Sequence, residues 1–192
     1  MFIEPRIKSD RCGWIEVICG SMFSGKTEEL IRRLRRAEMA KLRVGIFKPF
    51  ADTRHHHDKI ISHDEKSITS ISVSDANALL CAADLMDVVG IDEAQFFDDQ
   101  LSEVCDTLAL KGVRVILAGL DMDYLGNPFG QIPVLLSRAE YITKLHAICV
   151  HCGNIANYSY RKTVNAEQFL IGNADDYEPR CRFCFEKGNL LK

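Results

Sequence analysis

The segment Gly20-Ser-Met-Phe-Ser-Gly-Lys-Thr27 matches the pattern GxxxxGK[ST] at every fixed position. The residues before it, Trp14-Ile-Glu-Val-Ile-Cys19, form a short apolar run with β-branched side chains, which predicts a buried strand. The residues after it, from Lys26 to about Met39, carry apolar side chains at the spacing of one helix face. Because this pattern holds phosphate when it joins a strand to a helix, the segment predicts a phosphate-binding loop (P-loop).

The residue types of this loop suit the phosphates of ATP. Glycines allow successive backbone N–H groups to turn toward the phosphates, and the helix that begins there adds its positive end. Lys26 is expected to reach the β- and γ-phosphates, and the Thr27 hydroxyl is expected to ligate Mg²⁺. The alternative interpretation is an ordinary strand–turn–helix junction. The predicted ATP-binding loop comprises Gly20, Ser21, Met22, Phe23, Ser24, Gly25, Lys26 and Thr27.

A second apolar strand ends in two carboxylates, in the segment Val88-Val-Gly-Ile-Asp92-Glu93. A parallel strand delivers its carboxyl end to the same sheet edge as the P-loop, so Asp92 suits a second Mg²⁺ contact through a water. Glu93 then faces the nucleophile and can accept its proton. Ala94 and Gln95 complete the predicted nucleotide site. Two alternatives stay open: both acids are a solvated strand end, or the glutamate activates water, as in ATPases.

Strands and helices alternate along the remaining chain. Strands are predicted at 42–47, 86–92, 113–118 and 141–149, and helices at 75–82, 98–111 and 132–138, with 50–70 as a polar loop. This alternation predicts an α/β, P-loop NTPase-like (RecA-like) fold, a mostly parallel sheet with helices on both faces. Short segments follow Cys149, so we place a boundary near 147. A P-loop ATP-binding domain is predicted at 1–146 and a small metal-stapled subdomain at 147–192.

Four of the eight cysteines form two CxxC pairs that enclose 28 residues. Two such pairs can supply four thiolates, the closed tetrahedral set of structural Zn²⁺, which leaves no open position for catalysis. A redox CxxC and an iron–sulfur cluster are the alternatives. The separation exceeds the roughly 15–20 residues of a zinc ribbon, which suggests that the enclosed loop has its own task. The predicted zinc ligands are Cys149, Cys152, Cys181 and Cys184; the predicted buried apolar cysteines are Cys12, Cys19, Cys81 and Cys105.

Charge and hydropathy give no reason to expect nucleic acid or a membrane as partner. The 192 residues include 24 basic and 27 acidic side chains, for a net charge of −3. No apolar run approaches the roughly 20 residues of a membrane span, and residues 1–14 lack the apolar core of a secretory signal, so we expect a cytoplasmic location. The basic run 32–36 alternates with glutamates and is interpreted as a solvated helix face or subunit contact. A zinc-knuckle nucleic-acid-binding module remains a third possible function.

Further motifs are spread along the chain. They are Lys48-Pro-Phe-Ala-Asp-Thr-Arg54, Ser62-His-Asp64, Ile91-Asp-Glu-Ala-Gln-Phe-Phe97, Leu120-Asp-Met-Asp-Tyr-Leu-Gly-Asn-Pro-Phe-Gly130 and Ile171-Gly-Asn-Ala-Asp-Asp-Tyr177. Together with the P-loop and the cysteine pairs, their order and spacing resemble the zinc-containing (type II) thymidine kinases over nearly the whole chain. The resemblance implies ATP- and Mg²⁺-dependent phosphorylation of the 5′-hydroxyl of thymidine to dTMP, in deoxynucleoside salvage. It also implies a homotetramer that dTTP inhibits by feedback.

The resemblance assigns site residues as well. Glu93 matches the proton acceptor of that family, and the loop between the cysteine pairs would close like a lasso over the nucleoside, gripping the base through main-chain groups. Aromatic and apolar positions around the base carry a tyrosine, Tyr124, where many members have phenylalanine. The substrate residues implied by position are Met22, Asp52, Arg54, Phe96, Tyr124, Phe129, Leu170, Ile171, Gly172 and Tyr177.

Overall fold

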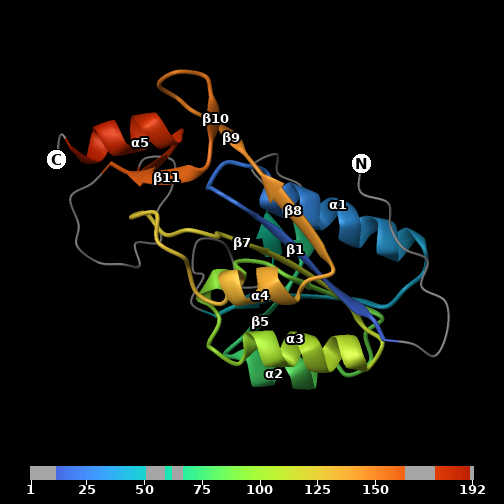
Figure 1. Ribbon diagram of the computed structural model, residues 1–192. Coiled ribbons are helices and arrows are strands. Elements are labelled where there is room, and N and C mark those ends of the chain that lie inside the picture. Colours follow the sequence, from blue (N-terminus) through green and yellow to red (C-terminus); the bar gives the residue numbers. More distant parts are fainter. Residues whose placement is uncertain (1–11, 51–58, 62–66, 163–175, 191–192) are drawn as a thin grey trace.

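The computed structural model describes residues 12–50, 59–61, 67–162 and 176–190. Its main sheet consists of β1 (Trp14–Gly20), β2 (Val44–Pro49), β5 (Ile71–Val73), β6 (Val88–Ile91), β7 (Arg114–Gly119) and β8 (Tyr141–Leu145). The strands lie in the order β5-β2-β6-β7-β1-β8, and each neighbouring pair runs parallel (Figure 1). All six carboxyl ends therefore lie at one edge of the sheet.

Helices cover both faces of this sheet, as predicted (Figure 1). Residues of β1 alternate between two cores, because successive strand side chains point to opposite faces: Ile18 packs with α1, whereas Val17 and Cys19 belong to the core under the other three helices. None of the helices in the described ranges is long and apolar enough to cross a membrane. The helices that cover the sheet are α1 (Lys26–Met39), α2 (Ala76–Ala82), α3 (Leu101–Leu110) and α4 (Ile132–Arg138).

The predicted loop at 50–70 is wrong in part. Two short strands, β3 (Lys59–Ile61) and β4 (Ser67–Thr69), pair antiparallel within it. The residues Ile71–Val73, which follow the predicted loop and are predicted as neither strand nor helix, form the edge strand β5. Each of these strands has three residues, too few to establish the alternation of side chains that identifies a strand in a sequence.

The strand predicted at 141–149 is divided in two. β8 ends at Leu145, and after His146 the chain forms β9 (Ala147–Ile148), which pairs antiparallel with β10 (Ile155–Ala156) outside the main sheet. An apolar run shows that a segment is extended, but it does not show which partner the segment pairs with. The break lies next to the boundary predicted near 147.

The segments after β8 build a small second unit, which we call the cysteine unit. It contains β9, β10, the antiparallel pair β11 (Tyr158–Arg161) and β12 (Tyr177–Arg180), and α5 (Arg182–Asn189). Tyr158 stacks on Phe185 with ring centroids 4.4 Å apart, and Tyr160 meets the same ring edge-on. Buried apolar area in a unit this small is limited, so these aromatic side chains and the cysteines supply most of its core.

The four cysteines outside the CxxC pairs divide into two kinds. Cys19 and Cys105 are buried, as predicted, and burial raises the pKa of the Cys19 thiol to about 11. Cys12 and Cys81 are exposed, so the prediction that they are buried is wrong. A cysteine on a short helix such as α2 can lie on either face, and its sequence neighbours do not decide which.

The interpretation of the basic run 32–36 as a solvated face fails at Arg33. This side chain is fully buried under α1, where its Nη1 donates to Glu16 Oε2 at 2.8 Å. Glu16, also fully buried, accepts at Oε1 from Arg114 Nε (2.6 Å) and from Trp14 Nε1 (2.7 Å). Arg33 also reaches Glu29 and Thr143, so the network ties α1 to β1, β7 and β8.

Replacing Arg33 tests the stability of this network. Arg33→Met keeps most of the buried aliphatic volume but leaves the Glu16 carboxylate short of one charged partner, so we expect the free energy of unfolding to fall by about 3 kcal/mol. Urea denaturation measures it. Arg36→Met, on the exposed side of the same helix, is the matched control and is expected to change stability by less than about 0.5 kcal/mol. Equal urea midpoints for the two variants would contradict the prediction.

Candidate active site

The P-loop joins β1 to α1 at the carboxyl edge of the sheet. Gly20 has φ 146°, and a Cβ there would lie 2.2 Å from the Leu145 carbonyl oxygen, so no side chain fits. Gly25, with φ 85°, precedes the first residue of α1. Phe23, with φ 64°, also adopts the left-handed conformation, which is uncommon for a bulky residue. The loop therefore has the tight, irregular backbone that turns N–H groups toward one point.

Hydrogen bonds close the P-loop on itself. The Lys26 ammonium donates to the Ser21 carbonyl oxygen at 2.8 Å, and the Ser24 hydroxyl donates to the same oxygen at 2.8 Å. The Lys26 side chain thus folds back over the loop that precedes it. Its positive charge lies beside the N-terminus of α1, where the helix dipole is also positive, so this part of the edge favours an anion.

The two residues predicted to hold Mg²⁺ lie together. The Thr27 hydroxyl donates to Asp92 Oδ2 at 3.3 Å, and the Glu93 N–H donates to Asp92 Oδ1 at 3.0 Å. Asp92 is nearly buried, and it follows β6, which is separated from β1 by β7. A hydroxyl and a carboxylate at this distance are oxygen ligands of the kind Mg²⁺ prefers, so these residues fit the ion.

Glu93 has a strained backbone and a fixed side chain. Its φ of 52° is left-handed, and it begins the short 3₁₀ helix η1 (Ala94–Phe96), in which Ala94 is buried. The carboxylate accepts from Gln95 Nε2 at 2.5 Å, and Gln95 Oε1 in turn accepts from the Leu120 N–H at 3.0 Å. Gln95 is 2% exposed. Glu93 is therefore aimed by a buried amide that is itself bound to the segment after β7.

Four aromatic residues predicted around a base fall into two groups in the described structure. Phe96 and Phe129 pack edge to face with ring centroids 5.7 Å apart. Tyr124 and Tyr177 flank Arg161: its guanidinium lies 3.6 Å from the Tyr124 ring centroid, and its Nε and Nη2 donate to the Tyr177 hydroxyl at 3.0 and 2.7 Å. The segment 120–130 and the cysteine unit thus meet at this edge of the sheet.

The four paired cysteines converge in the cysteine unit. Their Sγ atoms all lie within 4.8 Å of one another, so the set could hold a metal ion. Burial raises the pKa of the Cys149 thiol, but hydrogen bonds from the N–H groups of Cys181, His151 and Cys152 outweigh it and lower the pKa to about 6. A thiolate is the form that binds metal. His151 points away: its side chain is half exposed and its ring contacts Glu178.

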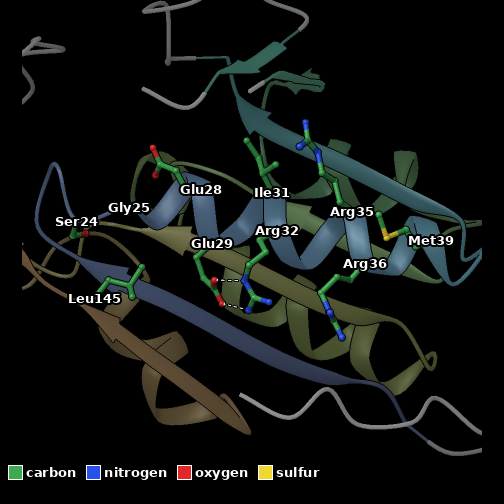
Figure 2. Close-up of a pocket in the computed structure, with 10 residues that line it drawn as sticks. All are labelled: Ser24, Gly25, Glu28, Glu29, Ile31, Arg32, Arg35, Arg36, Met39 and Leu145. Atoms are coloured by element: carbon green, nitrogen blue, oxygen red, sulfur yellow. Dashed lines mark hydrogen bonds and ion pairs between the residues drawn. The ribbon is translucent and has the colours of Figure 1, made fainter. Parts of the chain in front are cut away.

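A groove runs along α1 beside the P-loop (Figure 2). It begins at Ser24 and Gly25, the end at which Leu145 also lies, and extends to Met39. The Glu29–Arg32 ion pair lies on its wall (Figure 2). Neither Asp92 nor Glu93 lines this groove, so it is separate from the paired acids.

Five predicted substrate residues, Asp52, Arg54, Leu170, Ile171 and Gly172, lie outside the residues that the structure describes.

Comparison with known proteins decides the family. The family described as "Thymidine kinase" matches residues 13–185. The chain belongs to the thymidine kinase family. It is 54% identical over 186 residues to a thymidine kinase of Bacteroides thetaiotaomicron, covering 96% of this chain and 94% of that one. It is 58% identical over 188 residues to a thymidine kinase of Rhodothermus sp., covering 97% and 88%, and 52% identical over 179 residues to one of Porphyromonas gingivalis, covering 93% and 88%.

Membership of the thymidine kinase family confirms the resemblance inferred from the sequence and its α/β fold. The roles of individual residues stay predictions.

Two buried polar residues of the cysteine unit could not be predicted as functional from the sequence. Ser159 accepts a hydrogen bond from the Met22 N–H at 3.0 Å, and Arg161 lies between the two tyrosines. Both lie on β11, whose four residues are all buried. A serine and an arginine in a short strand form no recognisable motif.

Proposed function

We propose that this member of the thymidine kinase family transfers the γ-phosphoryl group of ATP to the 5′-hydroxyl of thymidine, yielding dTMP. The observation that carries the proposal is the meeting of three groups at one sheet edge. They are the P-loop with Lys26, the Thr27–Asp92 pair, and a Glu93 carboxylate fixed beside the segment 120–130. An anion cradle, a cation site and a base are the parts that phosphoryl transfer to an alcohol requires.

The residues divide the reaction between them. N–H groups of 24–27 and the Lys26 ammonium hold the β- and γ-phosphates, and Thr27 and Asp92 hold Mg²⁺, which neutralises charge that develops on the phosphates. Glu93 orients the 5′-hydroxyl and accepts its proton. Gln95 keeps the carboxylate aimed, because its amide donates to Glu93 while its carbonyl is bound to the Leu120 N–H.

The nucleoside is proposed to lie against the aromatic side chains. Phe96 and Phe129 offer an apolar edge-to-face pair, and Tyr124 and Tyr177 are held in place by Arg161. A flat pyrimidine gains from such aromatic packing. Met22 and the unplaced residues Asp52, Arg54, Leu170, Ile171 and Gly172 complete the proposed contacts. Closure of the loop between the cysteine pairs would exclude water and favour transfer to the alcohol over hydrolysis.

Zinc is the proposed occupant of the four-cysteine cluster. Four cysteine sulfur atoms within 4.8 Å of one another could supply the closed tetrahedral set of a structural Zn²⁺ site. The ion would tie β9–β10 to the start of α5 and so fix both ends of the loop between them. Assembly as a homotetramer, feedback inhibition by dTTP and a cytoplasmic location remain predictions from the family resemblance and the sequence.

A nucleoside panel tests the proposed reaction. With ATP and Mg²⁺, we expect ATP consumption to require thymidine and to yield one dTMP for each ADP, measured by chromatography of both products. Reactions without nucleoside, and with deoxycytidine or deoxyadenosine, are the controls. ATP hydrolysis at the same rate without nucleoside would favour the ATPase alternative, and binding of DNA that weakens steeply with salt, without turnover, would favour the nucleic-acid-binding module.

Glu93→Gln tests the assignment of the base. The amide keeps the shape of the side chain but cannot accept the proton, so we expect kcat to fall by about 10²- to 10⁴-fold while ATP affinity changes by less than about twofold. Glu103→Gln, on the exposed surface of α3, is the matched control and is expected to retain full activity. A Glu93→Gln enzyme with near-normal kcat would show that another group accepts the proton.

Cys181→Ser tests the metal site. Removal of one of four thiolates is expected to lower bound zinc from about one ion per chain to nearly none, measured by mass spectrometry of the elements, and to raise the KM for nucleoside. Cys81→Ser replaces an exposed cysteine of α2 and is expected to leave the metal content unchanged. Unaltered zinc in Cys181→Ser would rule out the four-cysteine assignment.

A further inference from the structure

Three consecutive residues of the P-loop contact the cysteine unit. The Ser21 hydroxyl donates to the Ala156 carbonyl oxygen at 3.3 Å, and the Met22 N–H donates to Ser159 Oγ at 3.0 Å. The Phe23 ring packs against the small core of that unit. That core is formed by Ala147, Cys149, Ala156 and Cys181, with Cys184 at its margin. The first half of the loop is therefore attached to the cysteine unit at three points: the Ala156 carbonyl, the Ser159 hydroxyl and the core that includes two of the paired cysteines.

The backbone at Phe23 needs this attachment. A non-glycine residue in the left-handed region brings its Cβ too close to the backbone, and an aromatic residue is rarely found there. At φ 64° the partly buried Phe23 side chain packs against the core that includes Cys149 and Cys181. The apolar contact that this packing provides offsets the cost of the backbone conformation. The strained conformation therefore persists because the cysteine unit provides a place for the ring.

The attachment passes along the loop to Lys26. Ser21, held on one side by Ala156, presents its carbonyl oxygen to both Ser24 Oγ and Lys26 Nζ, each at 2.8 Å. Residues 21–23 are thus held by the cysteine unit, whereas residues 24–27 form the part of the loop that is proposed to hold phosphate. A shift of the anchored half would move the Lys26 ammonium and the N-terminus of α1 relative to each other.

We propose that Phe23 is a positioning residue for the phosphate cradle, and that through it the four-cysteine cluster sets the affinity for ATP as well as for nucleoside. The proposal rests on the proposed function, in that the P-loop binds Mg²⁺–ATP. Its physical content is a coupling free energy: a folded cysteine core favours the P-loop conformation that binds phosphate. By linkage, if bound metal raises the affinity for nucleotide by some factor, bound nucleotide raises the affinity for the metal by the same factor.

Nucleotide binding without turnover tests the first part. Titration calorimetry of the zinc-loaded protein with Mg²⁺ and the non-hydrolysable β,γ-imido analogue of ATP is expected to show about tenfold weaker binding for Phe23→Ala, within the range of allosteric couplings. Phe183→Ala is the matched control: this ring belongs to the same unit but is 74% exposed, so binding is expected to stay within about twofold of the wild-type value.

Ser159→Ala provides a second variant in case Phe23→Ala does not fold. It removes the acceptor of the Met22 N–H without touching the P-loop itself, and we expect the analogue to bind several-fold more weakly. Wild-type affinity in both variants, or in Ser159→Ala when Phe23→Ala is unfolded, overturns the proposal. Failure of the wild-type protein to bind the analogue would instead overturn the proposed function.

Competition for zinc tests the coupling itself. A chromogenic chelator is titrated against the zinc-loaded protein with and without Mg²⁺ and the ATP analogue. We expect the analogue to raise the apparent zinc affinity of the wild-type protein by about tenfold, the same factor by which bound zinc raises the affinity for the analogue. In Phe23→Ala this effect should be lost. Equal zinc affinity of the wild-type protein with and without the analogue would show that the two sites are not coupled.

Discussion

The parallel direction of β6, β7, β1 and β8 is the constraint on which the site depends. Parallel strands bring their carboxyl ends to one edge, so the segments after β6, after β7 and after β1 meet although they are far apart in the sequence. Asp92 and Glu93, Leu120, and the P-loop come together for this reason. β8 extends the same edge and leads directly into β9, so the cysteine unit starts beside the P-loop. A reversal of β6 or of β1 would separate the P-loop from the carboxylates of Asp92 and Glu93.

Several residues with positive φ angles lie in the segments that follow the strands at this edge. Four of the positive φ angles, at Gly20, Phe23, Gly25 and Glu93, lie within the proposed phosphate and base sites, and two of these residues are not glycine. Strain of this kind persists only where surrounding contacts fix the chain. At Glu93 the fixing contact is the hydrogen bond from Gln95, and at Phe23 it is the packing of the ring against the cysteine core. The contact that fixes Phe23 comes from a segment distant in the sequence, whereas Glu93 is fixed by Gln95, two residues away, which is itself bound to Leu120.

Local patterns explain what could be predicted. The P-loop motif, the apolar strand before Asp92 and the CxxC pairs are recognisable from neighbouring residues alone, and they located the sheet edge, the paired acids and the cysteine cluster. Arg33 and Arg161 could not be placed in this way. Each is an arginine buried by a tertiary partner, Glu16 in one case and two tyrosines in the other, and a charged residue in a sequence looks the same whether its partner is water or protein. The division of the strand at 141–149 was missed because β-pairing is also a tertiary property.

The cysteine unit is too small to be stable on apolar burial alone, and this explains why it shares its core with the P-loop. Units of this size need a metal or another staple, and four cysteines provide the ligands for one. The aromatic residues Tyr158, Tyr160 and Phe185 fill one side, whereas the cysteine side is completed by Phe23 of the P-loop. A core built from both units cannot change in one without moving the other. The P-loop and the described part of the cysteine unit therefore share one core, in which the four cysteines lie beside Phe23.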